Sequence, residues 1–370
     1  MSNTRIERDS MGELQVPAEA LYGAQTQRAV NNFPISHQRM PAQFIRALIL
    51  AKAAAAKVNV DLKQISEGQG KAIVDAAQGL LEGDYMRHFP VDIFQTGSGT
   101  SSNMNANEVI ATLASRLLGE AVNPNDHVNC GQSSNDIIPT TIHVSAALVL
   151  HEQTLPALLH LVQVIEQKAE EVHPFIKTGR THLMDAMPLT FGQEFSAWSA
   201  QLSSAQARIE DTLKRVRRLP LGGTAIGTGI NADPRYQALA VQRLATISGH
   251  PLVPAADLIE ATSDMGAFVL FSGMLKRTAV KLSKICNDLR LLSSGPRTGI
   301  NEINLPARQP GSSIMPGKVN PVIPEAVNQV AFAIMGNDLA LTVAAEGGQL
   351  QLNVMEPLIA YKIFDSIRLL

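Results

Sequence analysis

Two long stretches of the chain place apolar side chains at spacings that alternate between three and four residues. In residues 190–219 the series is Phe195, Trp198, Leu202, Ala205, Ile209, Leu213 and Val216. In residues 263–292 the series is Phe268, Phe271, Leu275, Thr278, Leu282, Ile285 and Leu289. This alternation is typical of the contact seam between packed, nearly parallel helices. A helix of about thirty residues reaches roughly 45 Å and cannot bury such a seam alone, so we expect an elongated helical bundle.

Other segments also carry helical patterns, and their distribution predicts the domain organisation. Helices are expected at residues 44–61, 68–81, 105–118, 137–171 with a kink at Pro156, 324–345, and from 354 onward. The first part of the chain mixes short helices with irregular segments. We therefore predict a mainly α protein with a smaller mixed N-terminal domain at 1–130 and a helical-bundle domain at 131–370. No Gly, Asn or Pro stop signal precedes Leu370, so we expect a small C-terminal domain to be missing.

The composition narrows the class of protein. Charged residues make up 17% of the chain, which is too few for a disordered, self-repelling polymer. Lys and Arg total 31 and Asp and Glu 33, and this balance argues against a protein that grips nucleic acid nonspecifically. The two cysteines, Cys130 and Cys286, are far apart, and no disulfide framework is expected. The N-terminus lacks the apolar region of a signal peptide, and the apolar run at 47–58 is interrupted by Lys52 and Lys57. A cytoplasmic protein that does not enter membranes is expected.

Two polar loops in the first half of the chain combine residue types that bind anions. The loop at Thr96–Asn103 sets hydroxyl groups beside two glycines, and such loops cradle carboxylates or phosphates. A plain Gly/Ser turn is the simpler interpretation of this loop alone. The segment Gln132–Asp136 precedes a predicted helix and contains three consecutive polar residues, Ser133, Ser134 and Asn135. A helix needs only one capping side chain, so this excess favours an anion site at the helix N-terminus.

A third loop, at residues 311–321, offers a richer set of groups. Ser312 and Ser313 provide hydroxyls, Lys318 a cation and Asn320 hydrogen bonds, between two glycines that allow close approach to a ligand. The loop is not a nucleotide-binding Walker loop, because its glycine spacing is one residue too long and Val319 replaces the required Ser or Thr. A solvated loop between helices is the alternative, which the apolar residues 314–316 make less favourable.

Histidines and glycines elsewhere give weaker signals. His182, in Gly179–Ala186, is a lone histidine, and none of the nine histidines shows zinc-ligand spacing. No metal site is therefore predicted. The segment Gly222–Gly229 follows a long helix rather than a strand, so it is interpreted as a structural turn and not a dinucleotide site.

Taken in order, these segments resemble the class II fumarase/aspartase superfamily. The resemblance rests on 96–100, 133–136, 179–182 and, above all, the signature-like loop 311–321, and it extends from about Arg5 to Leu370. It implies a homotetramer with a central helical bundle. It also implies active sites composed from three subunits, a small dicarboxylate substrate, and neither metal nor organic cofactor.

The resemblance also implies roles for individual residues. Ser312 would be the base that removes a carbon-bound proton, and His182, held by Glu325, would activate or protonate the water or leaving group. Lys318 would stabilise the extra negative charge of the carbanion. The implied substrate-binding set is Ser98, Gly99, Thr100, Ser133, Ser134, Asn135, Thr181, Ser313, Lys318, Val319 and Asn320. A second, surface anion site would comprise Asn123, Pro124, Asn125 and Asp126, although Asn123 stands where many fumarases have a histidine.

Within the superfamily, different segments favour different activities. Residues 95–100, 133–134 and 316–318 resemble fumarases, whereas 259–264 and 349–356 are closer to aspartases. Because the first group should touch substrate, the resemblance favours reversible anti hydration of fumarate to (S)-malate, a hydro-lyase reaction of the tricarboxylic acid cycle. Aspartate ammonia-lyase is the alternative. A non-catalytic structural member is a third interpretation. The presence of Ser312, Lys318, Asn320 and His182 argues against it.

Overall fold

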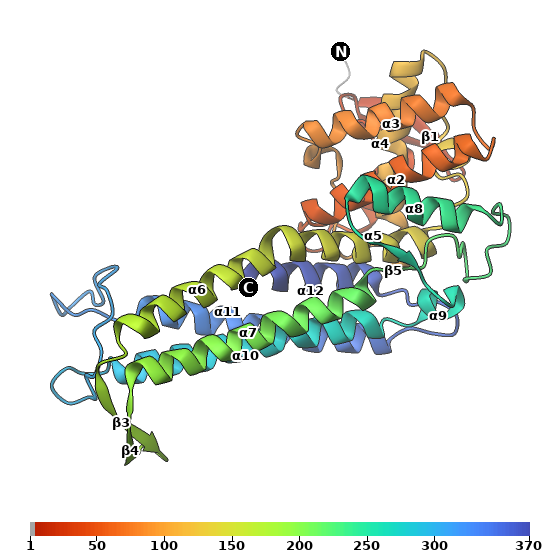
Figure 1. Ribbon diagram of the computed structural model, residues 1–370. Coiled ribbons are helices and arrows are strands. Elements are labelled where there is room, and N and C mark those ends of the chain that lie inside the picture. Colours follow the sequence, from red (N-terminus) through yellow and green to blue (C-terminus); the bar gives the residue numbers. More distant parts are fainter. Residues whose placement is uncertain (1–3) are drawn as a thin grey trace. The chain divides into compact units, whose positions relative to one another are not determined.

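The computed structural model describes residues 4–370, and the chain divides into two compact units (Figure 1). Unit 1 comprises Met1–Val149, Leu213–Val269 and Ala340–Phe364, and unit 2 comprises Leu150–Thr212, Leu270–Leu339 and Asp365–Leu370. The boundary expected near residue 130 stays a prediction.

Unit 1 is built mainly from helices and includes a two-stranded antiparallel hairpin at its start. Its elements are β1 (Thr4–Asp9), β2 (Gly12–Pro17), α1 (Ala24–Asn32), α2 (Ala42–Asp61), α3 (Glu67–Glu82), α4 (Thr100–Leu118), α5 (Ser134–Val149), β5 (Arg218–Leu219), α8 (Tyr236–Ser248), β6 (Val253–Pro254) and α9 (Leu258–Ser263). Helix α2 packs against α3, α5 and α8, and α4 packs against α1 and α3. The run of buried alanines at 53–56 in α2 permits this close approach on several sides, because small side chains shorten the distance between helix axes. This packing holds the starts of α4 and α5, which carry predicted site residues.

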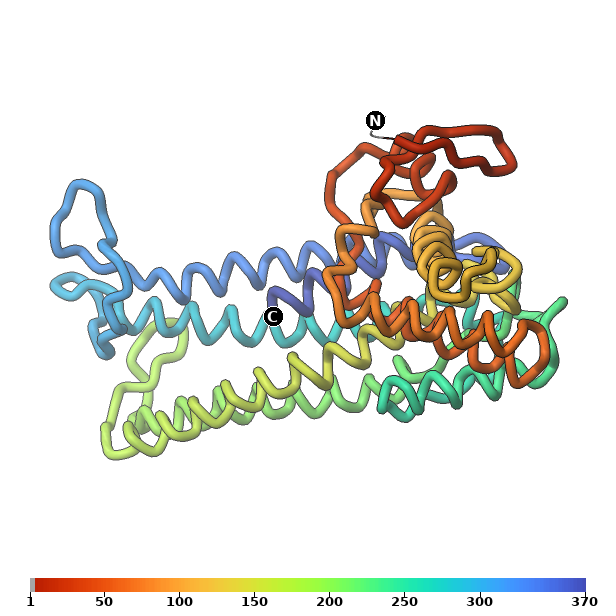
Figure 2. Tube along the Cα trace, turned by 90° about the horizontal axis from the view of Figure 1, so that it is seen from above, coloured from red at the N-terminus to blue at the C-terminus, as the bar shows by residue number. Residues whose placement is uncertain are grey.

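Unit 2 contains α6 (Leu155–Glu171) and the hairpin β3 (Ile176–Thr181) and β4 (Met184–Thr190). Four long helices contribute to both units: α7 (Phe191–Val216), α10 (Gly266–Leu292), α11 (Val322–Glu346) and α12 (Glu356–Leu369). In Figure 2 the loop of residues 293–321 leaves the unit-2 helices at the end where the β3–β4 hairpin also lies. Two segments with predicted catalytic residues therefore share one end of unit 2.

The apolar seams predicted in 190–219 and 263–292 are the buried faces of α7 and α10. Trp198, Leu202 and Leu275 are at most 3% exposed. Seam residues at the outer ends, such as Phe195 and Leu289, pack against a buried cluster that includes Trp198 and Leu202. The expected helices at 44–61, 68–81, 105–118, 324–345 and from 354 all form, with ends shifted by a few residues. The mainly α class is thus confirmed.

The helix expected at 137–171 is interrupted just before Pro156. A π-helical turn, η4 (Leu150–Thr154), separates α5 from α6. Proline lacks an amide hydrogen and clashes with the preceding turn, and a wider turn relieves this conflict. The stretch Ser134–Glu171 is also long and apolar enough to cross a membrane by length and composition alone, with 33% of its most apolar window buried. Within it, every residue from Asp136 to Val149 is buried in the core of unit 1.

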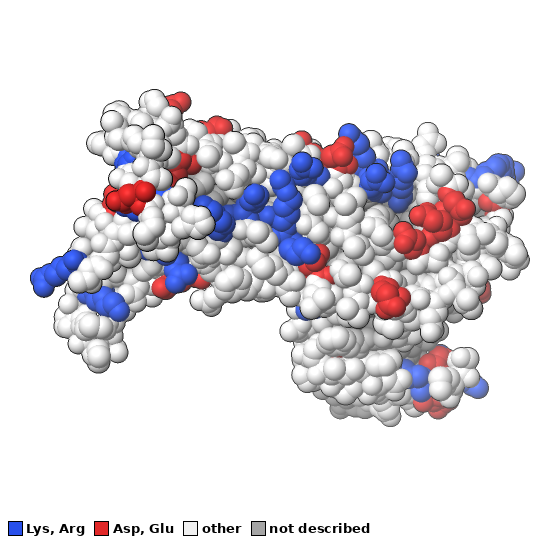
Figure 3. Space-filling view, turned by 90° about the horizontal axis from the view of Figure 1, so that it is seen from below, with Lys and Arg blue, Asp and Glu red and all other residues white. Residues whose placement is uncertain are grey.

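Both signs of charge are spread over the surface. In the face shown in Figure 3, several Lys and Arg side chains gather in a row, and Asp and Glu side chains form separate groups among wide uncharged areas. This mixture agrees with the formal net charge of −2.

Candidate functional site

The loop at residues 95–103 leads directly into helix α4. Residues Gly97–Gly99 form a short 3-10 turn in which Ser98 and Gly99 both have positive φ, 57° and 70°. A serine in this left-handed region is strained, and such strain is held in place only where surrounding contacts fix it. Here the Ser98 amide donates to the Val354 carbonyl at 3.3 Å, and the Ser98 and Thr100 hydroxyls lie 3.3 Å apart. The turn thus points two hydroxyls along the start of α4.

Two glycines of this loop have no room for a side chain. A Cβ atom on Gly97 would lie 2.7 Å from the Val354 carbonyl oxygen, and one on Gly99 would lie 2.9 Å from the Ile138 side chain. The glycines of the predicted motif are therefore required by close packing against α5 and the segment before α12.

The second predicted loop begins helix α5. The Ser133 amide donates to the Asp136 carboxylate, and the Ser133 hydroxyl accepts a hydrogen bond from the Asn135 amide at 3.2 Å. Asp136 also accepts from the amides of Gly222 and Thr224, at 3.1 and 2.9 Å. Asn135 in turn donates its side-chain amide to the carbonyl of Ala225 at 2.8 Å. The glycine-rich segment 222–229 is thus fastened to the predicted substrate turn, a neighbour that its sequence did not indicate.

The two loops of unit 1 meet. Asn103, in the first turn of α4, donates to the Ser134 hydroxyl at 3.1 Å and to the Asn129 side chain at 3.2 Å. The N-termini of α4 and α5 therefore converge, and their positive dipole ends lie close to one another. Such convergence favours an anion at this position.

Three acidic or basic side chains of unit 1, those of Lys52, Asp136 and Glu356, have no exposed surface. Lys52 donates to the side chains of Asn129 and Gln132, at 2.9 and 2.8 Å, and burial lowers its pKa to about 7. Burial raises the pKa of Asp136 to about 6, although its hydrogen bonds with backbone amides and the charge of Lys52 act in the opposite direction. Burial also raises the pKa of Glu356 well above its ordinary value, and neither of its carboxyl oxygens has a hydrogen-bond partner among the described residues. Sequence reasoning gave none of these three a role in the site.

The predicted second anion site forms a self-contained turn. Asn123 caps the π-helical turn Pro124–Val128, and its side-chain oxygen accepts from the amides of Asn125 and Asp126 at 2.8 and 3.0 Å. The Asn123 amide donates to His127 at 2.9 Å. The Asn123 side-chain oxygen therefore has a local structural role.

In unit 2, the loop carrying Ser312 closes on itself. The Gly311 amide donates to the Lys318 carbonyl at 2.8 Å, and the Asn320 side chain donates to the Gly311 carbonyl at 2.6 Å. Inside this ring the Ser312 hydroxyl oxygen accepts hydrogen bonds from the amides of Ile314 and Met315, at 3.3 and 3.1 Å. Ser313 is exposed and makes no comparable contact within residues 4–370. The two adjacent serines thus have different surroundings.

A pocket of about 500 Å³ lies beside this ring. Its lining includes Lys318, Val319 and Asn320 of the loop, Glu325 of the first turn of α11, and Arg290 of α10. No hydrogen bond or ion pair of the Lys318 ammonium is recorded within residues 4–370, so its charge is available to a ligand.

Thr181 and His182 lie at the tip of the β3–β4 hairpin. Thr181 pairs with Met184, which leaves His182 and Leu183 as a two-residue turn with φ of 56° and 64°. A tight turn of this kind requires positive φ at both positions and normally uses Asn and Gly. Both residues are exposed. Their strained backbone holds the imidazole at the end of the hairpin.

The predicted site residues thus fall into separate groups. Unit 1 holds Ser98–Thr100 together with Ser133–Asn135, whereas unit 2 holds Thr181 and His182 on one segment and Ser312–Asn320 with Glu325 on another. Within residues 4–370, no hydrogen bond or ion pair joins His182 to Glu325. The described part of the chain also contains no cluster of His, Cys, Asp and Glu that could hold a metal ion.

Comparisons with known proteins place this arrangement in a family. A family model described as lyase matches residues 12–336. The chain is 64% identical to an aspartate ammonia-lyase of Pseudomonas canavaninivorans, over 99% of the chain and 79% of that relative. It is 60% identical to a fumarate hydratase class II 2 of Pseudomonas aeruginosa, over 100% of the chain and 81% of that relative. The chain belongs to the fumarase/aspartase superfamily of lyases.

Solved structures of this superfamily share the fold. A recombinant class II fumarase from Schistosoma mansoni is similar with a TM-score of 0.97 and 40% identity, over 99% of this chain and 81% of that one. A fumarate lyase:delta crystallin from Brucella melitensis bound to cobalt is similar with a TM-score of 0.96 and 52% identity, with the same coverage. The family resemblance drawn from the four loops is therefore confirmed, and with it the expectation of a lyase.

Proposed function

We propose that this superfamily member is a class II fumarate hydratase, which interconverts fumarate and (S)-malate by anti addition and loss of water. The observation that carries the proposed removal of a carbon-bound proton is the surroundings of Ser312. Two backbone amides already donate to its oxygen, so the negative charge that forms when the hydroxyl loses its proton is stabilised. An alkoxide has three lone pairs, and the third remains free to take a proton from carbon.

The substrate is a small dianion, and the proposed binding groups suit it. The convergent starts of α4 and α5 supply N–H groups and the hydroxyls of Ser98, Thr100, Ser133 and Ser134, with Asn135 alongside. Lys318 and Asn320 supply a cation and an amide, with backbone contacts from Gly99, Ser313 and Val319. When the carbon proton leaves, charge spreads into the adjacent carboxylate, and these fixed donors stabilise it.

The leaving hydroxide needs a proton, and we assign its delivery to His182. Glu325 would orient and charge this imidazole, and Thr181 would bind substrate beside it. Because no hydrogen bond or ion pair joins His182 to Glu325 within residues 4–370 of one chain, we propose a homotetramer in which three subunits complete each site. Exposed apolar residues on α11, among them Ile323, Phe332 and Leu339 at 58–67% exposure, support such an assembly.

Aspartate ammonia-lyase is the second candidate. Relatives that bear this name are 50–64% identical to the chain, and relatives named fumarate hydratase class II are 57–60% identical. Both reactions remove a proton next to a carboxylate, and they differ in the group that leaves. The fully buried carboxyl of Glu356 lies in a segment that resembles aspartases.

The deciding experiment offers malate, fumarate and aspartate to the purified protein separately. Formation of fumarate from malate without ammonia release from aspartate is the expected result. Ammonia release from aspartate with no malate turnover would replace the proposal by its alternative. The same assay on a Ser312→Ala variant serves as a control for contaminating activity.

We also propose that the protein acts in the cytoplasm, within the tricarboxylic acid cycle. The location is supported by the two cysteines, which are far apart and suit a reducing compartment.

A further inference from the structure

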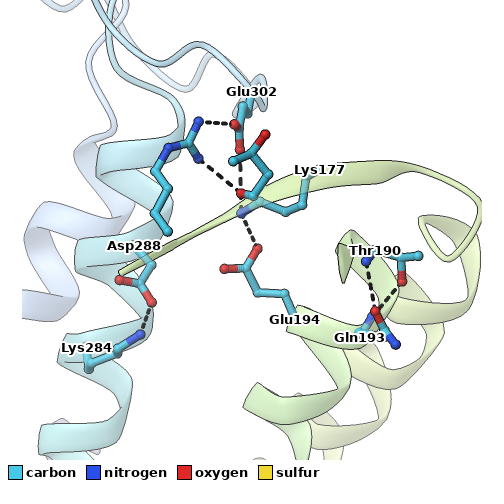
Figure 4. A network of polar contacts seen from close by, with 9 residues as sticks. Lys177, Thr190, Gln193, Glu194, Lys284, Asp288 and Glu302 are labelled. Carbon is cyan, nitrogen blue, oxygen red and sulfur yellow. Dashed lines mark hydrogen bonds and ion pairs between the residues drawn. The ribbon is translucent and has the colours of Figure 1, made fainter. Parts of the chain in front are cut away.

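A partly buried ionic network joins the β3–β4 hairpin to the loop that leads to Ser312. Lys177 of β3 is 5% exposed at its side chain and donates to Glu194 of α7 at 2.6 Å (Figure 4). The Lys177 ammonium also lies 3.5 Å from Glu302, and Arg180 of β3 donates to the other oxygen of the same carboxylate. Glu302 is thus the one described carboxylate that contacts both cations of the hairpin.

Glu302 is itself held firmly on the loop side. Its amide donates to the Leu292 carbonyl at the end of α10, at 2.9 Å. The neighbouring Ile300 and Ile303 pack against the cluster of Val162, Trp198 and Ile285. Ten residues further along the chain, the loop reaches Ser312. Glu302 therefore marks the fixed root of the loop.

On the hairpin side, Lys177 lies near the base and Arg180 lies close to the tip. Arg180 precedes Thr181 and His182 directly. Between the two cations the ladder is irregular, because Ala186 and Met187 oppose Gly179, and a Cβ atom there would meet the Met187 carbonyl oxygen at 2.7 Å. A bulge of this kind bends a hairpin and redirects the side chains beyond it. A bent hairpin with an exposed tip depends on its basal contacts for its direction.

We infer that Glu302 is a positioning residue that fixes the hairpin bearing Thr181 and His182 to the root of the Ser312 loop. Its two cations hold the pKa of this carboxyl below its ordinary range, with Arg180 contributing most, so it stays ionised and both contacts persist near neutral pH. The two segments proposed to exchange protons with substrate thereby keep one relative placement within each subunit. This inference rests on the proposed function for its effect on turnover.

The test uses Glu302→Gln, which keeps the shape of the side chain and removes its charge. Small misplacement of a catalytic group costs up to about 100-fold in rate, so kcat for malate dehydration should fall about 10- to 100-fold with a smaller change in KM. In a His182→Asn background the same change should cost less than about twofold, because Glu302 acts through the histidine. Asp288→Asn is the matched control. It removes an ion pair with Lys284 in the same unit, shown in the same figure, and should leave kcat within about twofold.

A second readout does not depend on the reaction. Backbone amides of residues 177–189 should exchange hydrogen about 10-fold faster in Glu302→Gln than in wild type or in Asp288→Asn. If Glu302→Gln does not fold, Arg180→Lys carries the same tests, because lysine keeps the charge but loses the forked contact. The inference would be overturned if Glu302→Gln lowered kcat by the same factor in the His182→Asn background as in wild type. It would also be overturned if the amides of the hairpin exchanged hydrogen at the wild-type rate in Glu302→Gln. If neither malate nor aspartate is converted by wild type, the proposed function fails and the exchange measurement alone decides the role of Glu302.

Discussion

Lys52 and Asp136 are both fully buried in unit 1, and the charge of Lys52 opposes the effect of burial on the pKa of Asp136. Asp136 lies in the first turn of α5, and Lys52 lies in α2, which packs against α5. The Lys52 ammonium donates to the side chain of Asn129, which also accepts a hydrogen bond from Asn103. The Asp136 carboxylate accepts a hydrogen bond from the Ser133 amide. The proposed substrate turn is therefore supported by two ionisable side chains that water does not reach.

Stability should depend on pH through Lys52. Its pKa is about 7 in the folded chain, against an ordinary 10.5, so above pH 7 the unfolded chain binds more protons at this residue. The free energy of unfolding of wild type relative to Lys52→Met should therefore rise with pH, by about 2 kcal/mol between roughly pH 7 and pH 9. Denaturant unfolding at several pH values measures it. Lys57→Met, exposed on the same helix, should show no such trend. If the free energy of unfolding of wild type relative to Lys52→Met stays constant or falls over this range, Lys52 is not a neutral, buried side chain in the folded protein.

Replacing Ser312 by alanine should abolish most turnover while substrate binding survives. The change removes the only oxygen proposed to take the carbon proton, and losses of about 100- to 10,000-fold are typical for such a group. The decrease should appear in kcat rather than KM, since the interaction forms mainly in the transition state. Ser313→Ala is the matched control, because Ser313 is exposed and adjacent. A dead Ser313→Ala enzyme beside a nearly normal Ser312→Ala enzyme would reverse the assignment.

Lys318→Met should weaken binding and turnover together. Its ammonium is proposed to face charge that is present in both the bound substrate and the transition state, and hydrogen bonds to charged groups contribute about 1.5–3 kcal/mol. We therefore expect kcat/KM to fall about 10- to 100-fold. Arg308→Met, exposed in the same loop but outside the pocket lining, should change it little. Equal kinetics for wild type and Lys318→Met remove this lysine from the site.

Gly97→Ala should destabilise the protein by about 1–3 kcal/mol, as overpacking does. The added methyl group would meet the Val354 carbonyl oxygen and displace the turn that carries Ser98. Thermal unfolding and KM should both change. Gly79→Ala is the contrasting variant, since a Cβ atom there meets nothing within 4 Å on helix α3. It should stabilise the protein by roughly 0.5–1 kcal/mol, and equal effects of the two substitutions would exclude the steric explanation.

The long helices could be predicted from sequence because their apolar periodicity is sustained over many turns. Phe268 and Leu275 of α10 and Trp198 and Leu202 of α7 recur at helical spacing, and tertiary packing follows that pattern. The β3–β4 hairpin was missed because it buries almost nothing. Its strands show no alternation of apolar and polar residues, and His182–Leu183 at its turn is not a recognisable turn sequence.

The candidate site was found through loop motifs, and its supporting residues were not. Lys52 belongs to an alanine-rich helical segment, where a lysine normally faces solvent, and nothing in the local pattern indicates its burial. The link between Glu302 and Arg180 spans 122 residues. Contacts of that sequence separation depend on how segments are placed in space, which spacing along the chain cannot supply.

The hydrogen bond between Gly311 and Lys318 has a consequence for how this chain can vary in length. The ring that it closes fixes the number of residues between Ser312 and Asn320, because an added residue would break the closure or displace the serine from its two amide donors. Residues 304–310 lie outside the ring, without helix or strand structure, and can absorb an insertion or a deletion by changing their path. Natural insertions and deletions should therefore occur in residues 304–310 and not between Gly311 and Asn320.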